Sequence, residues 1–387
     1  MSLHRCLATA VAVALVLATT QSSAAPRTIQ DQGQAIDVKQ RKSRPVYSYR
    51  RRPRVDVVFV LDTTGSMSGL IEGAKRKIWS IANQILRGQP RPDVRIGLIG
   101  YRDHGDDYVT RSFPLTGEID DVYSNLQQFA ANGGGDTPEH VNRALKEAIK
   151  DMQWRQGQNV LRQIFLVGDA PPHEGRDGLH SSQLARTALR RGIVINSVRC
   201  GAATETARVW QRIAALAGGK YASIRQDGAM IAIATPYDRE LARLNAELSA
   251  TLLPTGGRRA KAAVARRAAS NRAMGMAAQA ESATFRARSG RIDGQDLLGQ
   301  LKQGKKLSDF GDDELPAAVR ARPKAARKVY LAGVARKRAS VQGKILELSK
   351  KRDAFVKARS ARKGTTSFDD TITSALKAQG ASAGLAY

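Results

Sequence analysis

The stretch VDVVFVLDTTGSMSGL, residues 55–70, decides the fold of this chain. A run of apolar, β-forming residues ends at Asp62, and Thr64 and Ser66 follow at every second position before a helical pattern begins. A continuous apolar run, in place of strict alternation, predicts a strand that is buried on both faces. The turn after this strand, eased by Gly65, offers one carboxylate and two hydroxyls. A competing interpretation makes Thr64 or Ser66 an ordinary helix cap.

Further apolar runs follow in VRIGLIGY (94–101), QIFLVGD (163–169) and IVINSVR (193–199). They alternate with helical patterns around residues 67–87, 119–131, 137–153, 181–191 and 204–218. Alternating strands and helices predict an α/β fold with a doubly wound, mostly parallel sheet that carries helices on both sides. A basic, mainly α-helical region is expected to follow it.

Ligand sites in such sheets lie at the carboxyl ends of the strands. VVFVLD and IFLVGD both end in an aspartate at that edge. The first strand-to-helix turn contains neither G-x-G-x-x-G nor G-x-x-x-x-G-K-[ST], which excludes a dinucleotide or P-loop site there. The sequence therefore places carboxylates and hydroxyls at this edge.

Two more segments add oxygen ligands to the same edge. GGGDTPEH (133–140) is a glycine-rich loop, and VGDAPPH (167–173) ends the third apolar run. Because no His or Cys pair accompanies these oxygens, they suit Mg²⁺, Ca²⁺ or Mn²⁺, not zinc or copper. The candidate metal ligands are Asp62, Thr64, Ser66, Asp136, Thr137, Glu139 and Asp169.

Together, DTTGS, GGGDTPE and LVGDAPPH resemble a von Willebrand factor type A (VWA) domain of the bacterial secreted type, with its metal-ion-dependent adhesion site (MIDAS). The resemblance implies a VWA/Rossmann-like domain over 54–226. Asp62, Thr64 and Ser66 match the family's D-x-S-x-S motif, with Thr in place of the middle Ser, and Asp169 matches its later aspartate. Glu139 is the first choice for the middle ligand, and Asp136 and Thr137 are the alternatives.

The resemblance also implies what the site does. Its cation, with Mg²⁺ as the first choice and Ca²⁺ or Mn²⁺ as alternatives, is not catalytic and keeps an open position for an acidic group of a partner. The sequence shows no nucleophile elbow, no Ser/His/Asp order and no Cys/His pair, so we expect no enzyme. The expected function is metal-dependent binding or adhesion to a protein or glycan ligand.

The loop YRDHGDDYVTRSF, residues 101–113, adds further acidic residues near this edge. Asp103, Asp106 and Asp107 either rim the metal site, hold a second cation, or lie on a solvated hairpin tip. His104 and His173 flank the acidic loops without a metal-ligand partner at helical spacing, which favours surface histidines.

The first residues, MSLHRCLATAVAVALVLATTQSSAAP, have a short basic start, an apolar run and a small-residue stretch. This is the layout of a secretory signal peptide over 1–24, with cleavage near Ala24, and it predicts a secreted or periplasmic protein. The alternative, an uncleaved anchor, is disfavoured because the run is shorter than the ~20 residues that span a bilayer. No later segment is apolar enough to span one. Residues 25–53 form a basic, flexible lead-in.

The region 236–387 is basic and helical in pattern. Apolar residues at helical spacing (Leu331, Val334, Val341, Ile345, Leu348 and Phe355) are interrupted by Arg338 and Arg352. The pattern fits a coiled coil over about 329–362, a helical hairpin, or a helix that lies on the globular domain.

The whole chain has 63 Lys and Arg against 35 Asp and Glu, a net charge of +28. Such a surplus favours anionic partners. The alternative function is therefore binding of an anionic envelope polymer through the C-terminal region, with the VWA domain as scaffold. Nucleic acid is a less expected partner, because the aromatic residues of this region are few and scattered.

Overall fold

The computed structural model describes residues 52–135, 137–227, 233–360 and 368–387. The predicted signal peptide (1–24), nearly all of the lead-in (25–51) and the candidate ligand Asp136 lie outside these ranges. Residues 50–387 form one compact unit, to which every element below belongs. Within the described ranges, no helix combines the length and the apolar character that a membrane crossing requires.

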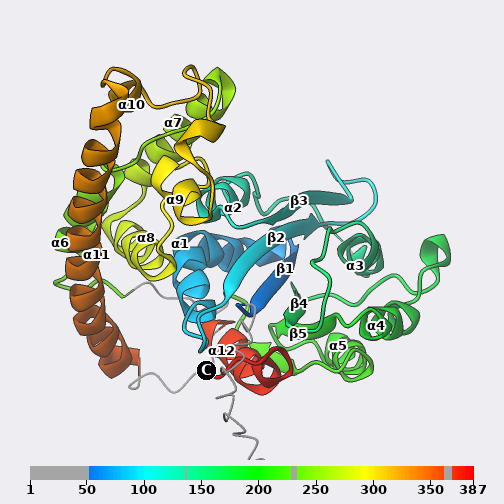
Figure 1. The fold of residues 1–387 in the computed structure, drawn as a ribbon. Coiled ribbons are helices and arrows are strands. Elements are labelled where there is room, and N and C mark those ends of the chain that lie inside the picture. Colours follow the sequence, from blue (N-terminus) through cyan, green and yellow to red (C-terminus); the bar gives the residue numbers. More distant parts are fainter. Residues whose placement is uncertain (1–51, 136, 228–232, 361–367) are drawn as a thin grey trace, which may run out of the picture. The chain divides into compact units, whose positions relative to one another are not determined.

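A six-stranded sheet with the order β3-β2-β1-β4-β5-β6 lies at the centre of this unit (Figure 1). Neighbouring strands are parallel, except that β3 runs antiparallel to β2. The fold class predicted from the sequence is therefore confirmed. The strands are β1 (Arg54–Asp62), β2 (Asp93–Tyr101), β3 (Thr110–Thr116), β4 (Val160–Gly168), β5 (Val194–Cys200) and β6 (Tyr221–Ile224).

Strand β1 is buried on both faces because helices cover each side of the sheet. Its alternate residues enter two different cores, since successive strand side chains point to opposite faces. Val57 and Phe59 pack with α1 (Ser68–Ile85) and α2 (Ile119–Leu126). Val58 and Val60 pack with α3 (Val141–Lys150), α4 (Ser181–Arg190) and α5 (Thr204–Leu216). This two-sided burial explains the continuous apolar run.

Strands β3 and β6 were not predicted, and both lie at an edge of the sheet. Their sequences, TRSFPLT and YASI, contain no continuous apolar run, and most of their residues are partly or fully exposed. An edge strand is covered less completely than a central one, so its sequence carries less of the apolar signal.

A helical layer follows the sheet along the chain. It comprises α6 (Asp238–Ser249), α7 (Arg258–Ala273), α8 (Met276–Ser289), α9 (Leu297–Lys302), α10 (Ala317–Arg320) and α11 (Lys324–Ser360). Helix α8 packs on α1, α7 packs on α2, and α11 lies across α6 and α8 (Figure 1). Short 3-10 turns occur at η1 (Gly65–Met67), η2 (Arg176–Gly178), η3 (Leu307–Asp309) and η4 (Gly380–Ala383).

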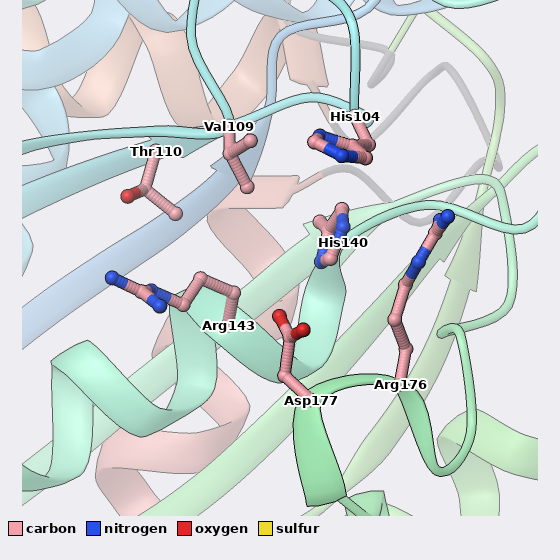
Figure 2. Close-up of a pocket in the computed structure, with 7 residues that line it drawn as sticks. All are labelled: His104, Val109, Thr110, His140, Arg143, Arg176 and Asp177. Atoms are coloured by element: carbon pink, nitrogen blue, oxygen red, sulfur yellow. The ribbon is translucent and has the colours of Figure 1, made fainter.

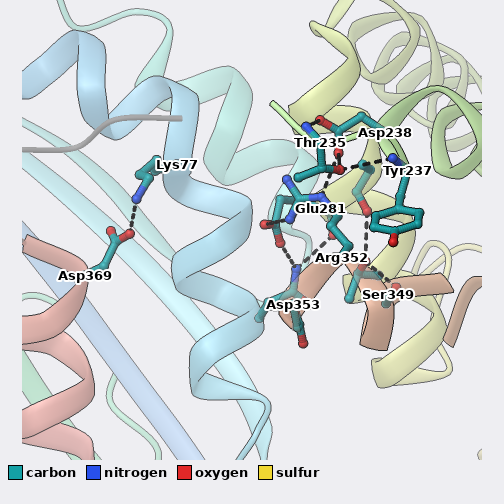
Figure 3. Close-up of polar contacts among 12 residues, drawn as sticks. Lys77, Thr235, Tyr237, Asp238, Glu281, Ser349, Arg352, Asp353 and Asp369 are labelled. Carbon is teal, nitrogen blue, oxygen red and sulfur yellow. Dashed lines mark hydrogen bonds and ion pairs between the residues drawn. The ribbon is translucent and has the colours of Figure 1, made fainter. Parts of the chain in front are cut away.

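Helix α11 lies on the globular part, as one of the three sequence-based alternatives has it. Its residues Val341 and Ile345 share a core with α6 and α8. The two arginines that interrupt the apolar seam are buried. Arg338 contacts Asp296, with Nη2 and Oδ1 3.0 Å apart, and Arg352 contacts Asp238 and Glu281 (Figure 3).

The last helix, α12 (Phe368–Gln379), returns to the sheet. The ring of Phe368 lies 6.0 Å from that of Phe59 on β1. Lys77 of α1 forms an ion pair with Asp369 (Figure 3), and the Tyr387 hydroxyl donates to the carbonyl of Ile85 at 3.0 Å. The segment 54–226 holds all six strands, and the final twenty residues add cover to one face of its sheet.

Candidate metal centre

Asp62 is the last residue of β1, and its side chain is fully buried. Its Oδ1 accepts hydrogen bonds from the Thr64 backbone N–H at 2.9 Å and from the Thr64 hydroxyl at 2.6 Å. Its Oδ2 is buried and has no hydrogen-bond partner within the described residues. One carboxylate oxygen is thus fixed by the turn, and the other is available to a ligand.

Thr64 and Ser66 do not cap a helix, so the capping interpretation is wrong. The residues at the capping positions of η1 and α1 are Thr64 and Met67, and neither makes a side-chain capping bond. The Thr64 hydroxyl donates to Asp62 instead and lies 3.3 Å from the hydroxyl oxygen of Ser66. Thr64 is buried and Ser66 is exposed, so the hydroxyls lead from the carboxylate toward the surface.

The glycine-rich loop approaches this turn closely. The Gly65 N–H donates to the Gly133 carbonyl at 3.0 Å. Gly134 has a φ of +69°, and a Cβ there would stand 3.0 Å from the Cβ of Thr64. A left-handed conformation and close packing both favour glycine at this position. Asp136 lies outside the described residues, and Thr137 is exposed.

Glu139 is buried at the end of this loop, with 3% of its surface exposed. Its N–H donates to the Pro171 carbonyl at 2.9 Å, and its carbonyl accepts from the His173 N–H at 3.1 Å. These bonds hold the glycine-rich loop against the loop after β4. Its Oε2, like Oδ2 of Asp62, is buried without a hydrogen-bond partner among the described residues.

Asp169 follows β4 and is half-buried. The Gln226 side-chain amide donates to its Oδ2 at 2.6 Å, and the Thr206 hydroxyl donates to its backbone carbonyl at 2.9 Å. Gln226 also donates to the Ser66 carbonyl at 3.2 Å, so it connects two of the site's loops. Sequence analysis missed Gln226, because one glutamine after an edge strand carries no local signal.

Burial and nearby charge make the carboxyl groups of Asp62 and Glu139 costly to ionise. The pKa of Asp62 is raised to about 7, mainly by burial; the hydrogen bonds from Thr64 lower it, and the nearby Asp169 carboxylate raises it. Burial also raises the pKa of Glu139 to about 9, and the charge of Asp62 is the next cause. Among the described residues, no Lys or Arg forms an ion pair with Asp62, Glu139 or Asp169.

This donor set fits a hard divalent cation. Two buried carboxylate oxygens lack partners, and two hydroxyls lie beside one of them. In the described part of the chain, no group of three His, Cys, Asp or Glu side chains is arranged to hold a metal ion. A cation here would therefore need the hydroxyls of Thr64 and Ser66, which oxygen-preferring ions accept.

The loop between β2 and β3 borders the site. The Asp106 carboxylate accepts from the N–H groups of Asp103 and Gly134, both at 3.1 Å, and Oδ1 of Asp103 lies 2.8 Å from Nε2 of His173. Asp103 and Asp106 thus lie beside the candidate metal ligands, whereas the third acid of residues 101–113, Asp107, is exposed and pairs with Arg102. His104 is exposed, as expected, whereas His173 is held by Asp103.

Comparison with known proteins identifies the domain. The von Willebrand factor A domain family model matches residues 56–230. The human von Willebrand factor A domain-containing protein 7 is 34% identical over 122 residues, 32% of this chain and 12% of that protein. The Dictyostelium discoideum alpha-protein kinase vwkA is 31% identical over 121 residues, 31% of this chain and 19% of that protein. The chain thus spans less than a fifth of these relatives.

Solved structures give a weaker likeness. The SpRpn10 VWA domain is 15% identical and covers 45% of this chain and 89% of its own, with a TM-score of 0.36. Mussel byssus proximal thread matrix protein 1, with a zinc-occupied MIDAS motif, is 13% identical and covers 44% and 42%, with a TM-score of 0.34. By the family match, residues 56–230 of this chain are a von Willebrand factor A domain.

Proposed function

We propose that this protein is an exported, metal-dependent binding protein and not an enzyme. VWA domains are generally involved in binding and adhesion. In the proposal, Mg²⁺ is held by Asp62, Ser66 and Asp169, with Thr64 and Glu139 completing the oxygen set. The ion supplies an electrophilic position that takes an acidic group of a protein or glycan partner. Ca²⁺ and Mn²⁺ prefer similar oxygen donors and are the alternative ions.

The observation that carries this proposal is the pair of unpartnered carboxylate oxygens, Oδ2 of Asp62 and Oε2 of Glu139. A buried carboxylate oxygen that lacks both a hydrogen-bond donor and a counter-charge costs roughly several kcal/mol when the group is ionised. A protein retains such groups where a ligand compensates them, and a divalent cation does so most directly. Glu139 stays the first choice for the middle ligand because it is buried, whereas Thr137 is exposed.

Export and a non-catalytic role are parts of the same proposal. Export rests on the signal-like sequence of residues 1–24. The non-catalytic role rests on the site's composition, since its side chains are acceptors and hydroxyls with no histidine or cysteine in the donor set. Turnover of an ester or phosphoester that is lost in Asp169→Ala would contradict this part.

Thermal unfolding with Mg²⁺ and with EDTA tests the metal site. At a Mg²⁺ concentration far above Kd, linkage raises the Tm of the wild type, on the order of 5 °C. Asp62→Asn keeps the shape of the side chain and should abolish the shift. Asp151→Asn, an exposed aspartate at the end of α3, is the matched control and should keep it. A wild type with no response to any of the three ions would refute the proposal.

A second candidate function is supported by the exposed face of α11. Its exposed basic residues are Lys324, Lys328, Arg336, Lys337, Lys344, Lys350, Lys351, Lys357 and Arg359, against Glu347 as the exposed acid. Such a face would attract an anionic envelope polymer. Affinity for polyglutamate that falls steeply with salt and persists in EDTA would favour this function, whereas affinity lost in EDTA would favour the metal.

A further inference from the structure

A pocket of about 300 Å³ lies beside the metal centre (Figure 2). His104, Thr110, His140, Arg143, Arg176 and Asp177 line it, with Val109 as an apolar wall, and we call it the rim pocket. His140 comes from the loop that carries Glu139, and Arg176 and Asp177 follow β4 as Asp169 does, whereas the remaining walls belong to the β2–β3 loop, the start of β3 and α3. His140 directly follows Glu139, so the two Cα atoms are about 3.8 Å apart. The loop that carries Glu139 therefore also supplies a wall of the rim pocket.

The two arginines of the rim pocket differ in whether a carboxylate neutralises their charge. Arg143 Nε donates to Glu147 at 3.0 Å, and the Thr110 hydroxyl donates to the same carboxylate oxygen at 2.8 Å. The charge of Arg143 is therefore largely compensated.

Arg176 contacts His173 instead of a carboxylate, with Nη1 3.2 Å from Nε2. The same Nε2 lies 2.8 Å from Oδ1 of Asp103. Because an ionised aspartate only accepts, this nitrogen carries a proton and cannot also accept from Arg176. Within the described residues Arg176 forms no ion pair with a carboxylate, and its side chain is exposed and extends beside His140 (Figure 2). Arg176 is thus the cation that the rim pocket offers to a ligand.

Asp177 limits which anion fits. Its φ is 55°, the one positive value for a non-glycine residue in the described ranges, and this backbone carries its carboxylate toward the rim pocket (Figure 2). Left-handed conformations of non-glycine residues are unfavourable and concentrate at binding sites. A simple anion would meet repulsion from Asp177. A group that combines a carboxylate with an N–H donor satisfies both Arg176 and Asp177.

The histidines give no second metal site. The rings of His140 and His173 lie 5.3 Å apart, and those of His104 and His140 lie 6.0 Å apart. Nevertheless, no trio of His, Cys, Asp or Glu side chains in the described ranges could hold an ion. His104 and His140 are therefore walls that a ligand contacts.

We propose that the rim pocket binds an acidic residue of a peptide partner, with its side-chain carboxylate on Arg176 and its backbone N–H on Asp177. The choice of an acidic partner rests on the proposed function, in which a neighbouring acid of the same partner goes to the metal. The rim pocket itself requires no metal. Partners with two nearby acidic residues would then bind more tightly than partners with one.

The direct test uses the full chain with ¹³C-labelled histidine, in EDTA, and N-acetylglutamate methylamide as the probe. The ring signals of His104 and His140 should shift saturably, and those of His180, which does not line the rim pocket, should not. N-acetylglutamine methylamide and inorganic phosphate should give no saturable shift. Arg176→Ala should weaken binding about tenfold, as loss of a charge-assisted contact implies. Arg208→Ala, which removes an exposed charge from α5, is the matched control.

The outcomes separate this inference from the proposed function. Equal shifts in wild type and Arg176→Ala, or no saturable shift in wild type, would overturn the rim pocket whatever Mg²⁺ does. Equal shifts with phosphate would mean that the rim pocket binds anions in general, and this would also overturn the proposed peptide site. A fluorescein-labelled peptide with two glutamates, measured in Mg²⁺, should bind about tenfold tighter than its one-glutamate analogue. If EDTA leaves this affinity unchanged while the histidine signals respond, the metal proposal fails and the rim pocket stands.

Discussion

Asp62 and Glu139 each have one buried carboxylate oxygen without a hydrogen-bond partner among the described residues. These two oxygens are the acceptors that the site offers to a ligand. A protein that bound nothing here would be more stable with amides at these positions. In the proposed function, the two acids give up stability for binding, a trade-off that is common at functional sites. The neighbouring hydroxyl of Thr64 and the amide of Gln226 hold the set in place.

The stability of the metal-free protein should depend on pH through Asp62. Its folded-state pKa, about 7, is above the usual value of 3.8. The protonated form is therefore favoured by folding, and this stability is fully present below about pH 4 and is lost as pH rises through 7. In EDTA, Asp62→Asn should gain up to about 4 kcal/mol over wild type between pH 4 and 8. Urea unfolding at several pH values measures this, and a constant difference would contradict the prediction.

Gln226 should tune the affinity for the cation without contacting it. Its amide orients Asp169, and residues that orient metal ligands affect affinity about 10–100-fold. Gln226→Ala should therefore weaken Mg²⁺ binding about tenfold, as measured by calorimetry. Gln211→Ala, an exposed glutamine on α5, should leave the affinity unchanged. Equal affinity in both variants would show that Asp169 needs no such support.

The elements around the site show which signals a sequence carries. The run that ends at Asp62 predicts β1, because a strand buried on both faces must be apolar throughout. The pattern over 67–87 predicts α1, observed at Ser68–Ile85. Strand β6 and the contact of Gln226 with Asp169 could not be predicted, because edge strands lack the apolar run and contacts between distant residues leave no local pattern.

The buried charges of helix α11 also could not be interpreted from the sequence alone. Arg338 interrupts an apolar seam, which suggests a weak or alternative interface when the sequence is considered alone. The structure places Asp296 against it, 42 residues away along the chain. A buried charge becomes intelligible only when its partner is known.

Breaking this pair should be costly. Arg338→Met leaves Asp296 buried without its counter-charge, and we expect a loss of about 3 kcal/mol in the free energy of unfolding. Arg336→Met changes an exposed arginine on the same helix and should cost under about 0.5 kcal/mol. Urea unfolding followed by circular dichroism compares the two, and similar losses would mean that the buried pair contributes little.

The two ends of the described chain meet on one face of the sheet. Strand β1 begins at Arg54, and α12 covers the same strand through Phe368. The N–H of Gln89 donates to the carbonyl of Ala386 at 2.7 Å, and the N–H of Ala386 donates back at 2.9 Å. The helical layer thus lies, along the chain, between two segments that both belong to the sheet domain: β6 and α12.

Removing the Phe368 ring should destabilise the sheet. Its side chain is 2% exposed, and a Phe→Ala change in a core costs about 3–5 kcal/mol. Phe368→Ala should therefore lower the midpoint of urea unfolding followed by tryptophan fluorescence. Phe310→Ala, half-buried and packed in the helical layer, should lower it much less. An unchanged midpoint in Phe368→Ala would show that α12 does not contribute to the core.

The position of α12 also determines when the domain finishes folding. The strand that carries Asp62 is made before the helical layer, and the helix that covers it, which ends at Gln379, is made after that layer. During synthesis, part of the β1 face stays uncovered until α12 has emerged. Contacts between such distant residues form slowly. A chain of this order leaves the face of β1 that Phe368 covers exposed while the rest of the sheet and the helical layer are made.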